Sequence, residues 1–83
     1  MKLSNTEKQI IELFVNGMGC YNTMDICRKL GTKYPYTNQL LWGLNASGLL
    51  NKTRRVKSNR GFVYYHLNEE NEEVQGLIKS IDQ

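Results

Sequence analysis

Acidic residues are missing from the whole middle of this 83-residue sequence. Residues 26–68 contain no Asp or Glu, while the same block holds eight Lys and Arg residues. The flanking segments 1–25 and 69–83 carry net charges of −1 and −4, so the overall charge is only +3. An ordinary solvated surface mixes both signs, whereas a surface that meets a polyanion has to stay positive. The missing acids therefore favour a nucleic-acid partner.

Residues that build catalytic and metal sites are also scarce. The chain has two cysteines, Cys20 and Cys27, and one histidine, His66. Two cysteines are too few for a disulfide framework, and with one distant histidine they make a poor zinc site. We therefore expect two reduced, partly buried thiols and no metal or other cofactor, with a redox role for the pair left open. No nucleophile–base pair, carboxylate pair or phosphate-binding glycine loop stands out, so we predict that the protein is not an enzyme.

Long apolar runs are missing as well. No stretch approaches the roughly 18 residues needed to cross a membrane, and the first residues do not resemble a signal peptide. We therefore expect no membrane partner and a cytoplasmic location, in the host cell if the chain is viral. The hydrophobic content of 40% is typical of a globular chain, and the length predicts one domain over residues 1–83.

Capping residues and glycines mark two helices near the N-terminus. Ser4–Glu7 has the pattern of a capping box and opens a helix over about residues 5–16, where apolar residues recur at helical spacing. Thr23 is expected to cap a second helix over residues 24–30. Gly31 is expected to end that helix.

A third helix is predicted over about residues 35–47, with Pro35 in its first turn. We expect Trp42 in the core or at its edge, with packing against the following hairpin or a place on the outer face of the helix as the alternatives. The inward face of this helix is expected to consist of Thr37, Leu40, Leu41 and Leu44.

The second half of the chain changes to strand periodicity. Leu50–Val56 and Phe62–Leu67 are predicted to pair as a hairpin around a turn at Lys57–Gly61. A last helix is predicted over residues 69–82, with four glutamates in its first turns. The predicted order is helix, short strand, helix, helix, hairpin, helix, which is an α+β, mostly helical fold.

This order and the spacing of glycines and leucines resemble the winged helix-turn-helix family. The match is carried by Asp25-Ile26, Leu30-Gly31, Thr37, Leu44, Gly48-Leu49-Leu50 and Tyr65-His66-Leu67. The resemblance covers residues 4–67 and implies a winged helix-turn-helix followed by an extra C-terminal helix at 68–83. It also implies a small transcriptional regulator that binds double-stranded DNA in a sequence-specific way.

The third helix is the predicted recognition helix. The short turn after Gly31 sets it across the second helix, so that its outer face protrudes and fits the roughly 12 Å wide major groove. Asn and Gln pair well with adenine edges, and Tyr hydroxyls reach phosphates or bases. The predicted base-reading residues are Tyr36, Asn38 and Gln39. The predicted backbone contacts before and at the helix start are Lys33 and Tyr34.

The hairpin, residues 52–61, is the predicted basic wing, with five of the eleven basic residues within nine positions. The resemblance implies that a wing lies along the DNA backbone or enters the minor groove. Arg60, beside Gly61, is our candidate for the minor groove, where negative potential is concentrated. The residues expected on phosphates are Lys52, Arg54, Arg55 and Lys57. The alternative is a solvated hairpin whose charges protect a sheet edge from aggregation.

The C-terminal helix carries one apolar stripe, formed by Val74, Leu77, Ile78 and Ile81. Its acidic start argues against contact with DNA. The stripe either packs on its own domain or pairs with the same helix of a second copy, and we favour the homodimer, which implies palindromic half-sites.

Two other functions remain open. Asn38 and Trp42 also fall on the positions that contact left-handed duplexes in the Z-alpha family, which this chain resembles more weakly. Tyr34 and Pro35 stand where that family has lysines, and the wing lacks its Pro-Pro-x-Trp motif. The other alternative is a winged helix that binds a protein and no nucleic acid, although such a surface seldom needs eight uncompensated cations.

Overall fold

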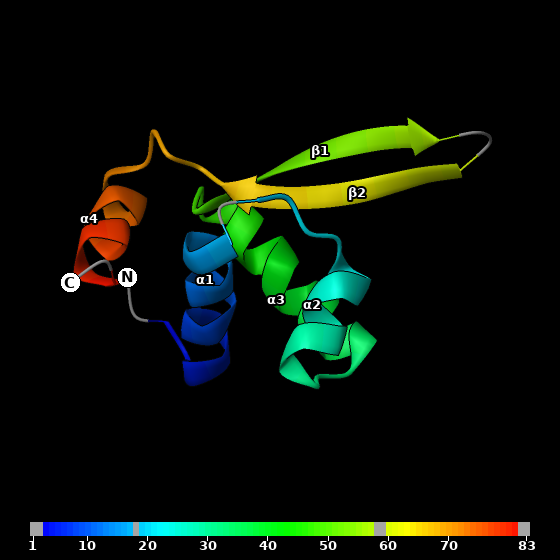
Figure 1. Ribbon diagram of the computed structural model, residues 1–83, viewed down its shortest axis with the longest axis horizontal. Helices are drawn as coiled ribbons and strands as arrows, with labels where there is room; N and C mark the ends of the chain where they lie inside the picture. The colour runs from blue at the N-terminus through cyan, green and yellow to red at the C-terminus, as the bar shows by residue number, and fades with distance from the viewer. Residues whose placement is uncertain (1–2, 18, 58–59, 82–83) are drawn as a thin grey trace.

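A computed structural model describes residues 3–17, 19–57 and 60–81, with side chains described except at 54–57, 60–62 and 81. Figure 1 shows the order α1 (Asn5–Gly17), α2 (Thr23–Leu30), α3 (Tyr34–Ala46), β1 (Leu50–Lys57), β2 (Arg60–Leu67) and α4 (Glu72–Ile81). This is the α+β, mostly helical arrangement that the sequence predicts. None of these helices has the length and apolar character to cross a membrane, within the part of the chain that is described.

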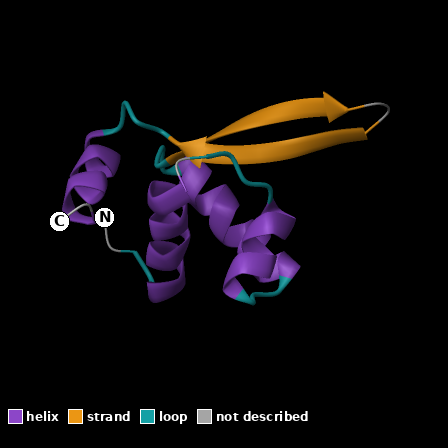
Figure 2. Ribbon diagram, in the orientation of Figure 1, coloured by secondary structure: helices purple, strands orange, loops and turns teal. Residues whose placement is uncertain are grey.

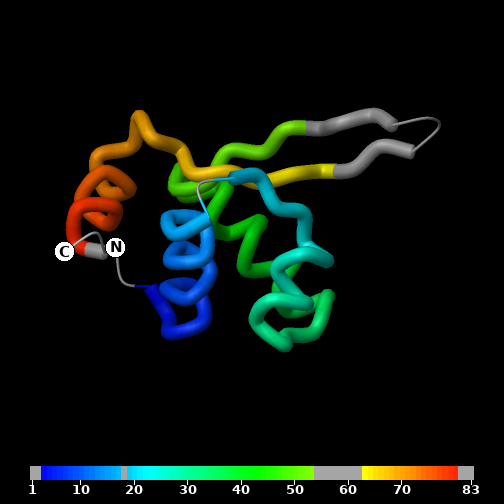
Figure 3. The backbone as a smooth tube through the Cα atoms, in the orientation of Figure 1, coloured from blue at the N-terminus to red at the C-terminus, as the bar shows by residue number. Residues whose placement is uncertain are grey.

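The hairpin of β1 and β2 extends beyond the helical body, which Figure 2 shows in purple. Helices α2 and α3 pack together, and α4 lies beside α1 at the other end of the molecule. The backbone tube in Figure 3 shows α4 at the end of the molecule opposite the projecting hairpin. The molecule extends 41 Å along its longest axis and 25 and 21 Å along the other two, and the projecting hairpin accounts for the greater length.

One core joins all the elements. Phe14 from α1, Ile26 from α2, Leu41 from α3 and Val74 from α4 are buried together with residues at the base of the hairpin. Burying a side chain of this size stabilises the fold by about 1.5–3 kcal/mol. The core thus fixes α3 and the hairpin base relative to the other helices.

The starts of α1 and α2 are built as capping boxes, and the second differs from the prediction. The Ser4 amide donates to the Glu7 carboxylate, and the Glu7 amide donates to the Ser4 hydroxyl, as predicted. At α2, however, the cap is Asn22, whose side chain accepts from the amide of Asp25 while the Asp25 carboxylate accepts from the Asn22 amide. The prediction of Thr23 as the cap was wrong, because Thr23 is buried inside the first turn of α2.

The hairpin is longer than predicted. Strand pairing continues to Lys57 opposite Arg60, so Gly61 pairs with Val56 inside the sheet and the predicted five-residue turn at Lys57–Gly61 was wrong. Residues 58 and 59 lie outside the described part of the chain. On the other edge of β2, Tyr21 forms an isolated antiparallel bridge with Tyr65, with N···O distances of 3.0 and 2.8 Å.

Helix α4 starts three residues later than predicted. The Asn71 side chain accepts from the amides of Glu73 and Val74, so residues 69 and 70 lie in the preceding turn. The side-chain amides of Asn68 and Asn71 both donate to the Gly48 carbonyl, which ties this turn to the end of α3. The glutamates at 69 and 70 are therefore outside the helix that we expected them to open.

The apolar stripe of α4 covers the core of its own domain. Val74 is fully buried, and Leu77 and Ile78 are partly buried against the core. The side chain of Ile81 lies outside the description. Val74 is therefore not available as a contact to a second copy, whereas Leu77 and Ile78 keep part of their surface.

Candidate nucleic-acid interface

The turn between α2 and α3 sets the position of the predicted recognition helix. Gly31 adopts φ 68° and ψ 32°, a left-handed conformation that costs glycine little, and its amide donates to the Cys27 carbonyl at 2.8 Å. Thr37, which is almost fully buried, donates to the Lys33 carbonyl at 2.9 Å and shares a hydroxyl contact of 2.6 Å with Thr32. These contacts fix the first turn of α3 on the end of α2.

A second contact joins the starts of the two helices. The buried Thr23 hydroxyl donates to the Asn38 side-chain oxygen at 3.0 Å. Because this oxygen is engaged inside the protein, the Asn38 amide group is the part of the side chain left for an outside partner. Asn38 is half-buried, so its role combines internal positioning with a partly exposed surface.

The outer face of α3 carries the residues that we expected there. Tyr34 and Tyr36 are 49% and 48% exposed, and Gln39 and Lys33 are also exposed. Within the helix, Thr37, Leu41 and Leu44 face the core, as the periodicity predicts. Leu40, the fourth predicted inward residue, is only half-buried.

Trp42 differs from the expectation of a core or core-edge residue. Its side chain is 62% exposed, the largest exposure among the large hydrophobic residues for which exposure is described. It lies one turn after Asn38 on the same helix face, which is the spacing that brings side chains together on a helix. This spacing was the signal in the sequence for an exposed Trp42, because a residue four positions after a surface residue lies on the same helix face.

A groove with a volume of about 630 Å³ lies on the surface between α3, the hairpin and the start of α2. Its apolar and aromatic lining comes from Met24, Tyr34, Trp42, Val63 and Tyr65, and Asn38 is also in it. Arg28 and Lys52 add positive charge. Asp25 is the acidic lining residue, and its carboxylate accepts from the Asn22 amide in the capping box.

Tyr65 forms part of this groove from inside the fold. Burial is the main cause that raises the pKa of its hydroxyl, and Tyr34 nearby raises it further. A hydrogen bond with the Trp42 side chain acts in the opposite direction. The indole N–H can only donate, so the Tyr65 oxygen accepts it. This bond joins the exposed Trp42 to a residue that is 2% exposed and held in the sheet.

The predicted wing is partly described. Lys52 is exposed and pairs with Tyr65 in the strand register. The backbones of Arg54, Arg55, Lys57 and Arg60 lie in the paired strands, while their side chains are outside the description. Arg60 lies in β2 opposite Lys57, inside the paired strands and not in the predicted turn.

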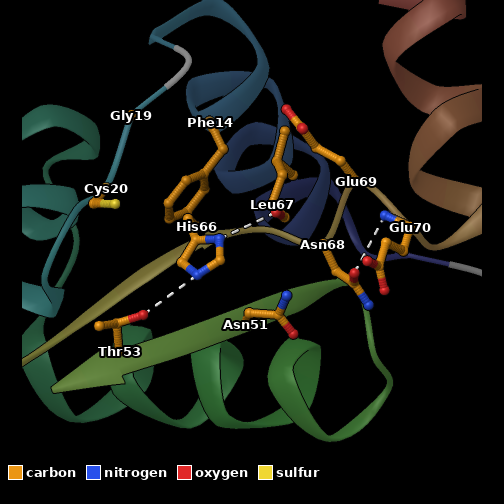
Figure 4. Close-up of a pocket in the computed structure, with 10 residues that line it drawn as sticks. All are labelled: Phe14, Gly19, Cys20, Asn51, Thr53, His66, Leu67, Asn68, Glu69 and Glu70. Carbon is orange, nitrogen blue, oxygen red and sulfur yellow. Dashed lines mark hydrogen bonds between the residues drawn. The ribbon is translucent and has the colours of Figure 1, made fainter.

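A second hollow lies on another part of the surface, at the base of the hairpin, and Figure 4 shows its lining. The ring of His66 is held there: its Nε2 is 3.4 Å from the Thr53 hydroxyl and its Nδ1 is 3.2 Å from the Leu67 carbonyl. The described residues contain no group of three or more His, Cys, Asp and Glu side chains arranged to hold a metal ion.

The two cysteines are unpaired thiols, and they differ in burial. Cys27 is buried on α2, whereas Cys20 is exposed at the edge of this second hollow. The expectation of two partly buried thiols was therefore wrong for Cys20.

No protein-family model and no curated protein sequence matches the chain. Solved structures do match, over nearly its whole length. ZitR from Lactococcus lactis, a zinc-responsive MarR family member, has a TM-score of 0.74 at 19% identity and is matched over 95% of this chain and 51% of its own. The adhesin competence repressor AdcR from Streptococcus pyogenes gives 0.77 at 18% identity, over 98% and 56%.

The transcriptional regulator HlyU from Vibrio vulnificus is similar at 28% identity, with a TM-score of 0.72 over 95% of this chain and 74% of HlyU. The chain spans about half the length of ZitR and AdcR. By their names these similar proteins are regulators and repressors rather than enzymes.

Proposed function

Because the chain has the winged helix-turn-helix fold of these solved transcriptional regulators, we propose that it binds double-stranded DNA in a sequence-specific way and regulates transcription. The observation that carries the proposal is the outer face of α3, which is exposed and polar or aromatic next to a hairpin in the acid-free block 26–68. A protruding helix reads bases in the major groove, and adjacent cations hold the phosphates.

In this proposal Tyr36, Asn38 and Gln39 read base edges. Asn38 keeps its amide group for a base acceptor, since its oxygen is bound by Thr23. Gln39 is exposed, and both its side-chain oxygen and its amide group can bond to an adenine edge. A good bidentate contact of this kind discriminates by about 1–3 kcal/mol against a wrong base.

The remaining polar residues of this face position the duplex. Lys33 and Tyr34 at the start of α3 meet phosphates, as does Lys52 on β1. The hairpin residues Arg54, Arg55, Lys57 and Arg60 complete this role, with Arg60 the candidate for the minor groove. Contacts with phosphates add affinity for every sequence and make binding fall as salt rises.

A homodimer is the form in which we propose that the chain binds. Leu77 and Ile78 retain exposed surface after packing on their own core, so they, with Ile81, are the residues of α4 that remain for a second copy. Val74 is excluded from this interface by its burial. A two-fold dimer would recognise a palindromic site with half-sites about one helical turn apart.

Selection from a random duplex library tests the function, with affinities for the winning and a scrambled duplex measured at two salt concentrations. We expect a palindromic site that binds far more tightly than the scrambled duplex. Gln39→Ala should weaken only the selected site, by about 1–3 kcal/mol, while the matched control Gln9→Ala on the exposed surface of α1 should leave it unchanged. Preference for left-handed duplex would favour the Z-form alternative, and absence of binding at low salt would favour a protein partner.

A further inference from the structure

Four of the five exposed large hydrophobic side chains that the structure describes lie around one groove. Met24, Tyr34, Trp42 and Val63 are each at least 40% exposed and line the same groove between α2, α3 and the hairpin. Soluble proteins rarely leave contiguous apolar surface open to water unless it binds something. Arg28 and Lys52 line the groove, and the one acid in its lining, Asp25, has its carboxylate engaged in the capping box of α2. Because the groove adjoins the face proposed to meet DNA, its occupant has to be both anionic and locally apolar.

Trp42 has a fixed polar neighbour in this groove. Its indole N–H lies near the Tyr65 hydroxyl and lowers the pKa of that group, and both the backbone amide and the carbonyl of Tyr65 are bonded to Tyr21. The Trp42 side chain nevertheless keeps 62% of its surface exposed. A side chain that is held before binding loses less conformational entropy when it meets its partner.

The position of Trp42 on α3 decides what it meets. It lies four residues after Asn38 and three after Gln39, so the three side chains share one stretch of helix surface. The next residue, Gly43, is also exposed, and a Cβ added there would contact nothing within 4 Å. The chain itself does not require glycine at this position of the helix, and the absent side chain leaves room for close approach of a ligand.

On the major-groove edges of base pairs, the thymine C5-methyl is the apolar group. The geometry points to Trp42 as a specificity-determining residue that reads a thymine through this methyl group, with Met24 and Val63 completing the apolar surface. The assignment rests on the proposed function, because it needs α3 in the major groove of double-stranded DNA. Lys52 and Arg28 lie at the same groove and match the charge of the strand that carries the thymine.

Single thymine-to-uracil replacements in the selected duplex test this assignment, because each removes one methyl group and keeps base pairing. The wild-type protein should lose affinity by about fourfold at one or two thymine positions, the effect of removing one buried methyl-sized group. In Trp42→Ala the same replacements should have no effect at those positions. Trp42→Phe, which keeps an aromatic ring, should retain part of the sensitivity.

Tyr36→Ala is the matched comparison, because it removes another half-exposed aromatic side chain of α3 that does not line the groove. It should weaken the thymine and uracil duplexes by the same factor. Circular dichroism melting verifies that each variant is folded, which the 62% exposure of Trp42 leads us to expect.

The outcomes separate the two claims. Binding without any sensitive thymine, or sensitivity that survives in Trp42→Ala, would overturn the role of Trp42 and leave the proposed function standing. If the wild-type protein binds no duplex, the proposed function fails and the thymine contact fails with it. Tighter binding to single strands, with Trp42 stacked on a base, would replace the methyl contact and overturn the assignment.

Discussion

Two exposed glycines, one at the end of α2 and one inside α3, should change the stability of the fold in opposite directions when each is replaced by alanine. Gly31 ends α2 at φ 68°, and Gly43 lies inside α3; a Cβ added at either position would contact nothing within 4 Å. Replacing either glycine by alanine therefore creates no steric clash. The left-handed conformation costs a residue with a side chain roughly 1–2 kcal/mol, partly offset by the about 0.4–1 kcal/mol gained because alanine restricts the unfolded chain.

Gly31→Ala should therefore lower the free energy of unfolding by about 1 kcal/mol. Gly43→Ala should raise it by about 0.8–1 kcal/mol, since alanine is the better helix former. The two variants should differ by about 2 kcal/mol, which in a domain of this size separates their melting temperatures by roughly 8–16 °C.

Urea unfolding followed by circular dichroism measures the difference, and Gly31→Asn serves as the control. Asparagine tolerates the left-handed region, so this variant should be less destabilised than Gly31→Ala. Equal stability of the two alanine variants would refute the assignment of Gly31 as a conformationally required cap. A destabilised Gly43→Ala would show that this glycine has a structural role inside the chain.

Three further outcomes follow from the structure. Lys52→Ala should lower the slope of log affinity against log salt by about 0.9, whereas Lys79→Ala on α4 should leave it unchanged; titrations at four salt concentrations measure both. Ile78→Glu should give a monomer in light scattering if α4 forms the dimer interface, and a surviving dimer would reject that interface. Stability should fall as pH rises above about 10, because burial raises the pKa of Tyr65 in the folded state and the unfolded state ionises first. Tyr65→Phe should weaken this pH dependence, and an unchanged pH profile would contradict the buried environment of the hydroxyl.

The helices and their order were predictable from local signals in the sequence. The capping box of Ser4 and Glu7, the end of α2 at Gly31 and the inward Thr37, Leu41 and Leu44 are properties of a few neighbouring residues, and the structure has all of them. The outward position of Gln39 follows from the same periodicity.

The errors concern residues whose place depends on contacts distant in sequence. Thr23 has the chemistry of a cap, yet it donates to Asn38 fifteen residues later, while Asn22 takes the cap. Trp42 was expected in the core because indole rings are usually well buried, but the core is already filled by smaller residues of α3 and the ring lies over the groove.

The extent of the hairpin and the start of α4 likewise depend on hydrogen bonds between residues that are not neighbours in the sequence. Strand register carries Gly61 into β2 opposite Val56, although glycine by itself favours a turn. The start of α4 is set by Asn71, whose side chain both caps the helix and reaches the Gly48 carbonyl twenty-three residues earlier. A run of glutamates favours a helix N-terminus, but it does not determine the residue at which the helix begins.

The central claim is that α3 and the hairpin, rather than α4 or the hollow at the hairpin base, meet DNA. Amide and indole chemical shifts of the protein, followed during titration with the selected duplex, test it most directly. We expect large changes over α3, over the hairpin and at the single tryptophan indole, with little change over α1. Changes confined to α4 or to the hollow around His66, with the Trp42 indole unmoved, would contradict it.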